Sequence, residues 1–394
     1  MTYKDSFLNH IAQTSDFPLT LEIEKAEGVY LHTKEGRKCI DFISGIAVSS
    51  LGHRHPEVVR AIKEQVDKHL HVMVYGEMVQ DAQVRFAELL INNLPSRFEQ
   101  VYLVNSGTEA NEGALKLAKK YTGRSKLIAF RNSYHGDTHG SLSVTGRDIY
   151  RDPYLPLLED VHFLDFNSYD GLAVIDEDTA AVIMEPIQGE GGIIPAQKEW
   201  LQEIRARVND AGALLIFDEI QSGFYRTGPF FAFQHYGVEP DILCMAKAMG
   251  GGMPIGGFAS SKDIFQTFKY DPPLNHVTTF GGHPVSCAAA HANLKVLIEG
   301  KYGERALRIE ELTKTYLKGK GIIEVRGKGA MLGLQLRDQQ LTQKVVETCF
   351  KNDILLGWTL HSDTLIRLAP PLIIEEETLI HVLERILNAI QTHA

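Results

Sequence analysis

Residues 241–256 read DILCMAKAMGGGMPIG and join a run of apolar residues to a lysine and three glycines. The run 241–246 is typical of a strand that is buried in a sheet. Lys247 follows it directly. Burial of a charged ammonium there is unfavourable unless a partner pairs with it. A lysine can also extend its ammonium to solvent from such a position. The stretch therefore indicates a sheet that ends in either a surface lysine or a lysine with a chemical task.

Similar apolar runs alternate with helical patterns along the middle of the chain. This alternation predicts a mostly parallel sheet with helices on both faces, so the expected fold class is α/β. The expected strands are residues 101–104, 126–130, 180–186, 213–219 and 241–246, and the expected helices are residues 107–121 and about 197–210.

The two ends of the chain show different patterns. After about residue 290 come an amphipathic helix, a strand region at 322–336, another helix and the strand TLIRLAP, which together predict a smaller α+β domain. The beginning of the chain resembles a hairpin and is too short to fold alone, so we expect it to pack with the C-terminal part. The predicted division is 1–44 for this N-terminal segment, 45–290 for the large domain and 291–394 for the C-terminal small domain.

Composition excludes several classes of partner. The formal net charge is −10 without long runs of one sign, so we expect neither nucleic acid nor a membrane to bind. The four cysteines have no C-x-x-C or Cys/His ligand spacing, which argues against a disulfide framework and a metal site. The N-terminus lacks the features of a signal peptide, and 18 apolar residues never run together, so a cytoplasmic location is expected.

Polar residues follow the expected strands at the edge where α/β sheets bind ligands. Asn105-Ser106-Gly107-Thr108-Glu109 opens a helix whose free amides and positive dipole end suit a phosphate, although a simple N-cap explains the same residues equally well. Asp218 ends the run ALLIF, where a buried carboxylate needs a cation or a donor. An ion pair inside the protein is the alternative to a ligand there.

A phosphate cradle, a carboxylate and a lysine at one edge of a sheet match the needs of pyridoxal 5′-phosphate, which we predict as the cofactor. Asp218 would keep the ring nitrogen protonated. Lys247 would bind the aldehyde and, once a substrate amine displaces it, move a proton between the substrate carbon and the cofactor carbon. The glycines at 250–252 would let the backbone pass close to the ligand.

Five segments, in order along nearly the whole chain, read NSGTEANEGALKLAKKYTGR, EPIQGEGG, LLIFDEIQSGFYRTG, PDILCMAKAMGGGMPIGG and TTFGGHPVSCAAA. They resemble the class III aminotransferases of the acetylornithine and ornithine type, which belong to the fold type I pyridoxal-phosphate enzymes. The resemblance implies that residues 45–290 bind the cofactor. It also implies an enzyme that moves an amino group from a terminal-amine donor to 2-oxoglutarate.

The resemblance assigns the cofactor contacts to matching positions. Two groups surround the ring: Tyr134 of SYHG, next to His135, would stack on one face, and Ile220 would pack on the other. Thr279 would reach the phosphate of the neighbouring subunit, which implies a homodimer with shared active sites. The remaining implied contacts are Ser106, Gly107 and Thr108 to the phosphate, Asp218 to the ring nitrogen, Gln221 to the phenolic oxygen and Lys247 to the aldehyde.

The resemblance further implies a device that serves two substrates. Arg367 in LIRLAPP would pair with Glu190 in EPIQGE while the amine donor is bound, and would then bind the α-carboxylate of 2-oxoglutarate. A bidentate arginine–carboxylate contact is strong and directional, so the arrangement is physically reasonable. A plain surface salt bridge is the alternative.

Asp137 departs from the family pattern. The acetylornithine and ornithine enzymes usually have an arginine there that grips the far carboxylate of the substrate, and an aspartate would repel that group. The string YHGDT is more similar to the diaminopelargonate-forming branch, whereas Ile46 agrees with the acetylornithine branch. A diaminopelargonate-type or other ω-amine transaminase and a glutamate-semialdehyde-type aminomutase therefore remain as alternatives, beside a cofactor-binding protein without turnover.

Overall fold

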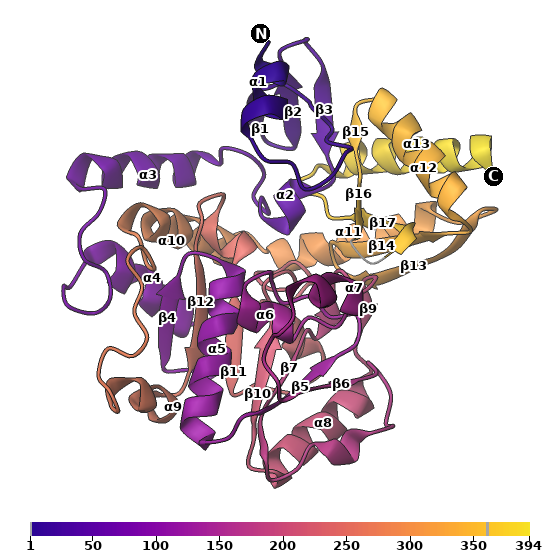
Figure 1. Cartoon of the computed structure of the whole chain (residues 1–394). Coiled ribbons are helices and arrows are strands. Elements are labelled where there is room, and N and C mark those ends of the chain that lie inside the picture. The colour runs from indigo at the N-terminus through magenta and orange to yellow at the C-terminus, as the bar shows by residue number, and fades with distance from the viewer. Residues whose placement is uncertain (1, 360–361) are drawn as a thin grey trace.

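A computed structural model describes residues 2–359 and 362–394, and its centre is a seven-stranded sheet (Figure 1). Parallel pairing joins β11 to β10, β10 to β7, β7 to β5 and β5 to β6, whereas β12 is antiparallel to both of its neighbours. The predicted α/β class and the mostly parallel sheet are confirmed. In spatial order the strands are β4 (Gln100–Val104), β12 (Gly256–Ser260), β11 (Ile242–Met245), β10 (Leu214–Asp218), β7 (Thr179–Met184), β5 (Lys126–Phe130) and β6 (Val161–Leu164).

Helices cover both faces of this sheet, as expected. Successive residues of a strand point to opposite faces. Leu214 and Ile216 of β10 accordingly pack with the residues of α5 (Gly107–Thr122). Leu215 and Phe217 pack in the other core, which contains residues of α4 (Asp81–Ile91), α8 (Lys198–Asp210) and α10 (Pro284–Glu299).

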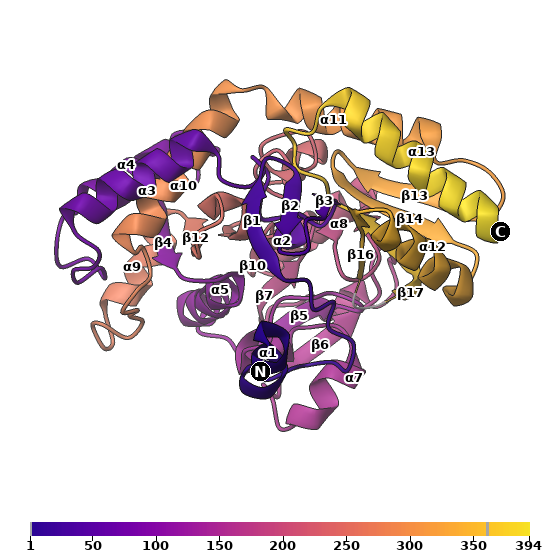
Figure 2. The same ribbon diagram turned by 90° about the horizontal axis from the view of Figure 1, so that it is seen from above.

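The C-terminal part forms a second, four-stranded antiparallel sheet, with α11 (Tyr302–Tyr316), α12 (Gln339–Lys351) and α13 (Glu376–His393) sharing its core (Figure 2). Its strands in spatial order are β13 (Ile322–Lys328), β14 (Met331–Leu336), β17 (Ser362–Leu368) and β16 (Gly357–Thr359). The N-terminal strands β1 (Ile23–Glu27), β2 (Tyr30–Thr33) and β3 (Lys38–Asp41) form a separate sheet, which β15 (Ile354–Leu355) joins by pairing with β3.

The predicted boundary between residues 290 and 291 lies inside α10. Leu294 and Leu297 of this helix belong to the large core, while Ile309 and Leu312 of α11 belong to the small one. We therefore propose that the large domain extends to the end of α10. The amphipathic pattern of α10 did not reveal which core it joins.

Among the described residues, no helix is both long and apolar enough to cross a membrane.

The other elements are short or peripheral. These elements are α1 (Tyr3–His10), α2 (Ser44–Ala47), α3 (Pro56–Lys68), α6 (His139–Ser143), α7 (Asp148–Arg151), α9 (Lys262–Gln266), β8 (Ile187–Gln188), β9 (Ile194–Pro195) and the 3₁₀ turns η1 (Asp152–Tyr154), η2 (Leu172–Val174), η3 (Ala232–His235), η4 (Lys247–Gly250) and η5 (Thr267–Lys269).

Candidate active site

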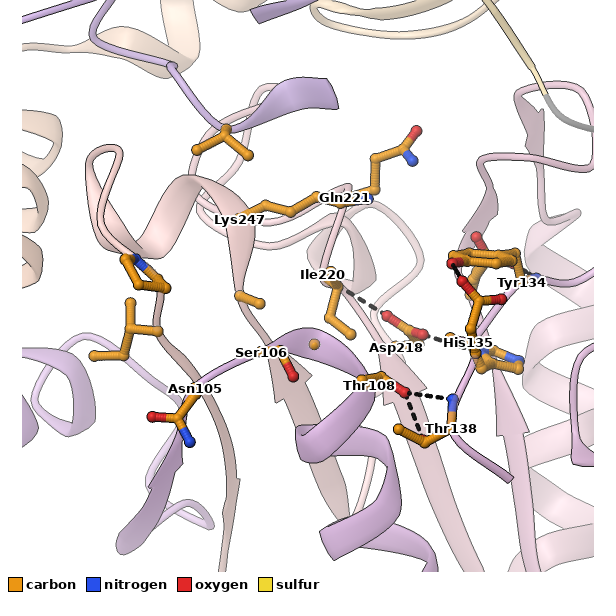
Figure 3. A pocket seen from close by; sticks show the side chains of 18 of the residues that line it. Asn105, Ser106, Thr108, Tyr134, His135, Thr138, Asp218, Ile220, Gln221 and Lys247 are labelled. Carbon is orange, nitrogen blue, oxygen red and sulfur yellow. Dashed lines mark hydrogen bonds and ion pairs between the residues drawn. The ribbon is translucent and has the colours of Figure 1, made fainter. Parts of the chain in front are cut away.

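A cavity of about 690 Å³ lies at the edge of the large sheet where β4, β10 and β11 end (Figure 3). The structure brings the three features that follow these strands into this one cavity. Its lining residues are Val48, Asn105, Ser106, Gly107, Thr108, Tyr134, His135, Gly136, Asp137, Thr138, Glu185, Asp218, Ile220, Gln221, Ala246, Lys247, Gly252, Met253, Pro254 and Ile255.

Asp218 is the last residue of β10 and is buried, yet three groups bind its carboxylate. Oδ2 lies 2.8 Å from Nδ1 of His135 and accepts a hydrogen bond from Nδ2 of Asn111 at 2.8 Å. Oδ1 accepts the amide of Ile220 at 3.1 Å. These bonds compensate the loss of water and hold the carboxylate in one orientation. Asp218 therefore presents an oriented carboxylate in a buried part of the cavity.

Lys247 begins η4 directly after β11 and adopts a left-handed backbone conformation with φ of 45°. Its side chain is partly buried and extends along the cavity wall toward Gln221 (Figure 3). Burial lowers the pKa of Lys247 below its ordinary value, opposed by the nearby Glu190 carboxylate and assisted by Arg367. A lowered pKa increases the fraction of neutral amine, which is the nucleophilic form.

The helix that follows β4 meets the cavity with its first turn. Ser106 is the N-cap of α5 and accepts the amide of Glu109 at 3.3 Å, so the simple capping role is present. The first backbone bond inside the helix runs from the amide of Ala110 to the carbonyl of Ser106. The amides of Gly107 and Thr108 precede it, and such groups can bind an anion.

Gly107 lies against the side chain of Ile220, which leaves little space for a side chain at position 107. A Cβ at position 107 would be 2.8 Å from Cδ1 of Ile220. Of the three glycines at 250–252, Gly252 lines the cavity. The other two pack against the protein: a Cβ at Gly251 would lie 2.9 Å from Asn293, and a Cβ at Gly250 would lie 2.9 Å from Ile255. Close packing within the protein, more than approach to a ligand, requires these two glycines.

Gly107→Ala is expected to weaken pyridoxal phosphate binding by roughly 5- to 150-fold, because overpacking a site costs about 1–3 kcal/mol. Titration of the cofactor-free protein with pyridoxal phosphate measures the dissociation constant. The matched control is Ile220→Ala, alone and combined with Gly107→Ala. If the clash is the cause, adding Gly107→Ala to the Ile220→Ala protein changes the affinity little. Additive losses in the double variant would exclude the clash.

Glu190 and Arg367 come from segments far apart in the chain and form a buried ion pair. The guanidinium hydrogen-bonds Oε1 of Glu190, and Nε2 of Gln221 donates to the same oxygen at 3.4 Å. Arg367 lies on β17 of the small domain, and Glu190 lies in the loop after β8. The structure thus places these two residues together as the resemblance implied, and buries them, unlike a surface salt bridge.

Arg226 fixes the segment that follows β17, and sequence reasoning gave it no role. Its side chain is fully buried and donates to the carbonyl of Pro370 at 2.7 Å and to Oγ of Ser50 at 2.8 Å. Burial lowers the pKa of Arg226 to about 10. Because Pro370 follows Arg367 by three residues, this contact ties the strand that carries Arg367 to the large domain.

Four predicted residues are not among those that line the cavity of this chain: the paired Glu190 and Arg367, which reach it through the contact of Glu190 with Gln221, and the separate Thr279 and Ile46. Thr279 is exposed in the segment between η5 and α10. Ile46 is 49% exposed and has a φ of 64° within the distorted helix α2. Val48, two residues later, lines the cavity in its place.

Two buried residues of the site were missed by sequence reasoning. Asn111 lies one turn into α5 and bonds both Asp218 and the carbonyl of His135. Glu185 lines the cavity and accepts the amides of Tyr134 and Gly189. Burial raises the pKa of Glu185 to about 7. Glu185 begins the quoted EPIQGE motif, so a signal existed for it, whereas Asn111 reads as an ordinary helix residue.

Comparison with known proteins identifies the family. The family model "Aminotransferase class-III" matches residues 11–390. The chain belongs to the class III aminotransferases. An acetylornithine aminotransferase of Methanopyrus kandleri is 39% identical over 387 residues, which cover 97% of each chain. A [LysW]-aminoadipate semialdehyde/glutamate semialdehyde transaminase of Sulfurisphaera tokodaii is 42% identical over 80% of this chain and 82% of its own.

Solved structures agree with this class III assignment. The ornithine aminotransferase of Toxoplasma gondii superposes with a TM-score of 0.91 at 28% identity, over 99% of this chain and 94% of that one. An amine transaminase from an uncultivated Pseudomonas species, determined with pyridoxal phosphate bound, gives 0.89 at 26% identity over 98% of each chain. The protein is therefore a pyridoxal-phosphate-dependent aminotransferase of fold type I.

The residues of the cavity fit this cofactor. Oε1 of Gln221 is buried without a hydrogen-bond partner among the described residues, so a ligand donor is needed there. Lys247 offers an amine, Asp218 an oriented carboxylate, and the first amides of α5 an anion site. When bound, pyridoxal phosphate supplies an electron sink for the carbanion of the substrate.

Proposed function

We propose that this class III aminotransferase moves an amino group from a terminal-amine donor of the ornithine or acetylornithine kind to 2-oxoglutarate. In the first half-reaction a donor R–CH₂–NH₃⁺ leaves as the aldehyde R–CHO, and the enzyme keeps the amino group. In the second, 2-oxoglutarate receives it and leaves as glutamate. The observation that carries the proposal is the buried Glu190–Arg367 pair beside the lysine.

The side chains divide the work between binding and proton transfer. Lys247 is the base that takes a proton from the donor carbon, and the lowered pKa suits it to this task at neutral pH. Asp218 holds positive charge at the ring nitrogen, oriented by Asn111 and His135. The ring of Tyr134 and the side chain of Ile220 line the cavity on either side of Asp218 (Figure 3).

The Glu190–Arg367 pair lets one cavity accept two kinds of substrate. While paired, the arginine offers no free charge, which suits a donor whose reacting end has no carboxylate. When the pair opens, the guanidinium can bind the α-carboxylate of 2-oxoglutarate in bidentate fashion. Gln221 donates a hydrogen bond to Glu190, so the Glu190 carboxylate keeps one partner when Arg367 leaves it.

Arg367→Lys is expected to raise the KM for 2-oxoglutarate by about 10- to 150-fold, because a hydrogen bond to a charged group contributes roughly 1.5–3 kcal/mol. The rate of the donor half-reaction should change much less, since the positive charge that pairs with Glu190 remains. Stopped-flow measurement of the two half-reactions separates these effects. Arg308→Lys, which alters an exposed ion pair with Glu376, is the matched control. Equal losses in both half-reactions would contradict the role of Arg367.

A diaminopelargonate-type or other ω-amine transaminase is the second candidate, and Asp137 favours it. This carboxylate lines the cavity, and the resemblance to the acetylornithine enzymes implied an arginine at its position. An aminomutase differs from both candidates because it retains its intermediate and needs no external oxo acid. A half-reaction screen with ω-amines and α-amino acids tests the proposal: conversion of the bound cofactor by terminal amines, reversed by 2-oxoglutarate, supports it. Turnover of a semialdehyde without any oxo acid would replace it by the aminomutase.

We also propose a homodimer with shared active sites and a cytoplasmic location. The dimer is supported by Thr279, which is exposed outside the cavity of its own chain. Val277 and Phe280 beside it are apolar and about half exposed. A partner subunit that covers this segment would bury both side chains.

A further inference from the structure

Asp137 stands at the exposed rim of the active-site cavity with one carboxylate oxygen occupied. The hydroxyl of Tyr134 donates to Oδ2 of Asp137 at 2.8 Å. Burial and, next, the contact with Asp137 raise the pKa of Tyr134, so the hydroxyl stays protonated and remains the donor. Oδ1 has no hydrogen-bond partner among the described residues. The tyrosine thus orients a carboxylate that keeps acceptor capacity toward the cavity.

The turn that carries Asp137 is fixed on both sides. Before it, the amide of Tyr134 donates to Oε2 of Glu185 at 3.2 Å. After it, the hydroxyls of Thr138 and Thr108 lie 2.7 Å apart. Gly136 between them has a φ of 128°, and a Cβ there would lie 2.3 Å from Oγ1 of Thr108. These contacts hold the backbone on both sides of Asp137 at the wall of the cavity.

Acidic side chains outnumber basic ones among the residues that line the cavity, and Asp137 is the acidic one at its exposed rim. Its acidic side chains are Asp137, Glu185 and Asp218. Its basic side chains are those of Lys247 and His135. Lys247 takes part in the reaction itself, and Nδ1 of His135 contacts Asp218. A carboxylate at the remote end of a donor would meet Asp137 without a spare cation among these lining residues. A remote ammonium would meet an oriented carboxylate with an available oxygen.

We propose that Asp137 makes the enzyme prefer donors with a second, free ammonium group at the end remote from the reacting amine. Diamines and diamino acids with an unacylated remote amine belong to this class. The preference rests on the proposed terminal-amine function and narrows its donor. The remote ammonium binds Oδ1 of Asp137 while the other amine lies beside Lys247. With pyridoxal phosphate bound, that amine would pass its nitrogen to the cofactor and its carbon would leave as an aldehyde, whose oxygen comes from water. The remote amine is unchanged.

The test compares three four-carbon donors that differ at the remote end: 1,4-diaminobutane, 1-aminobutane and 4-aminobutanoate. In single-turnover half-reactions of the wild-type holoenzyme, we expect kcat/KM to fall in that order, by about 10-fold or more from first to last. Ornithine should likewise exceed N-acetylornithine, which has the same carboxylate but an acylated amine. Asp137→Asn keeps an oxygen for Tyr134 and removes the charge. It should lower the ratio of diaminobutane to aminobutane rates and raise that of aminobutanoate to aminobutane.

The outcomes distinguish a wrong donor preference from a wrong proposed function. If N-acetylornithine or 4-aminobutanoate reacts as fast as the diamine, or if Asp137→Asn leaves both ratios unchanged, the preference for a remote ammonium is wrong and the terminal-amine function stands. If no terminal amine converts the bound cofactor, the proposed function fails and this inference fails with it. Tyr134→Phe supplies a second variant: loss of the orienting hydroxyl should shift the same ratios in the same direction as Asp137→Asn.

Discussion

Lys247→Ala is expected to lower the rate of both half-reactions by at least about 1,000-fold while the protein still folds. The substitution removes the amine that binds the cofactor and the base that moves the proton, and general acid–base catalysis alone contributes about 10²- to 10⁴-fold. Stopped-flow spectroscopy of the bound cofactor measures the rates, and thermal unfolding checks the fold.

Lys262→Ala is the matched control for this variant. Lys262 follows the neighbouring strand β12, but its side chain is exposed and lies 3.7 Å from Glu99 in a surface ion pair. Its loss should leave the half-reactions unchanged. Transamination retained in Lys247→Ala at more than a few per cent of the wild-type rate would contradict the assignment of the lysine.

Asp218→Asn should slow the donor half-reaction by about 100- to 1,000-fold. The neutral amide removes the charge that holds a proton on the ring nitrogen. Its NH₂ group also has to replace either Oδ1, where it would face the amide donor of Ile220, or Oδ2, where it would face the donor of Asn111. Single-turnover rates and the absorption spectrum of the bound cofactor measure the two consequences separately.

Asp176→Asn is a suitable control for Asp218→Asn, since Asp176 pairs with Lys126 away from the cavity. A loss of less than about 3-fold in Asp218→Asn would show that the charge at this position does not act on the reaction. A normal spectrum combined with a large loss of rate would place the effect after cofactor binding.

The sequence was sufficient to predict which edge of the large sheet carries the site residues. Lys247 and Asp218 each follow a strong apolar run, and parallel strands bring such ends together. The strand β12 was not predicted, because its sequence GGFAS has two glycines and reads as a turn. The structure explains the first of them: a Cβ at Gly256 would lie 2.2 Å from the carbonyl oxygen of Ser106. This contact joins residues that are far apart in the sequence, so no local pattern reveals it.

Contacts between distant segments of the chain could not be predicted from local sequence patterns either. The partners of Asp218 include Asn111, more than 100 residues away, and no periodicity indicates that an asparagine inside α5 faces β10. The pairing of Glu190 with Arg367 followed from family resemblance and not from either residue's local pattern. Likewise, Arg226 reads as part of a surface turn, yet it is fully buried between the domains. Such long-range contacts depend on how the domains pack.

Borohydride reduction of the native holoenzyme, followed by trypsin digestion and mass spectrometry, tests the central assignment most directly. Reduction fixes the cofactor to the lysine that it occupies, and trypsin does not cleave after a modified lysine. We predict the cofactor mass on a single peptide, residues 227–262, that spans Lys247. Separate, unmodified peptides 227–247 and 248–262, with the tag on another lysine or on none, would contradict the account.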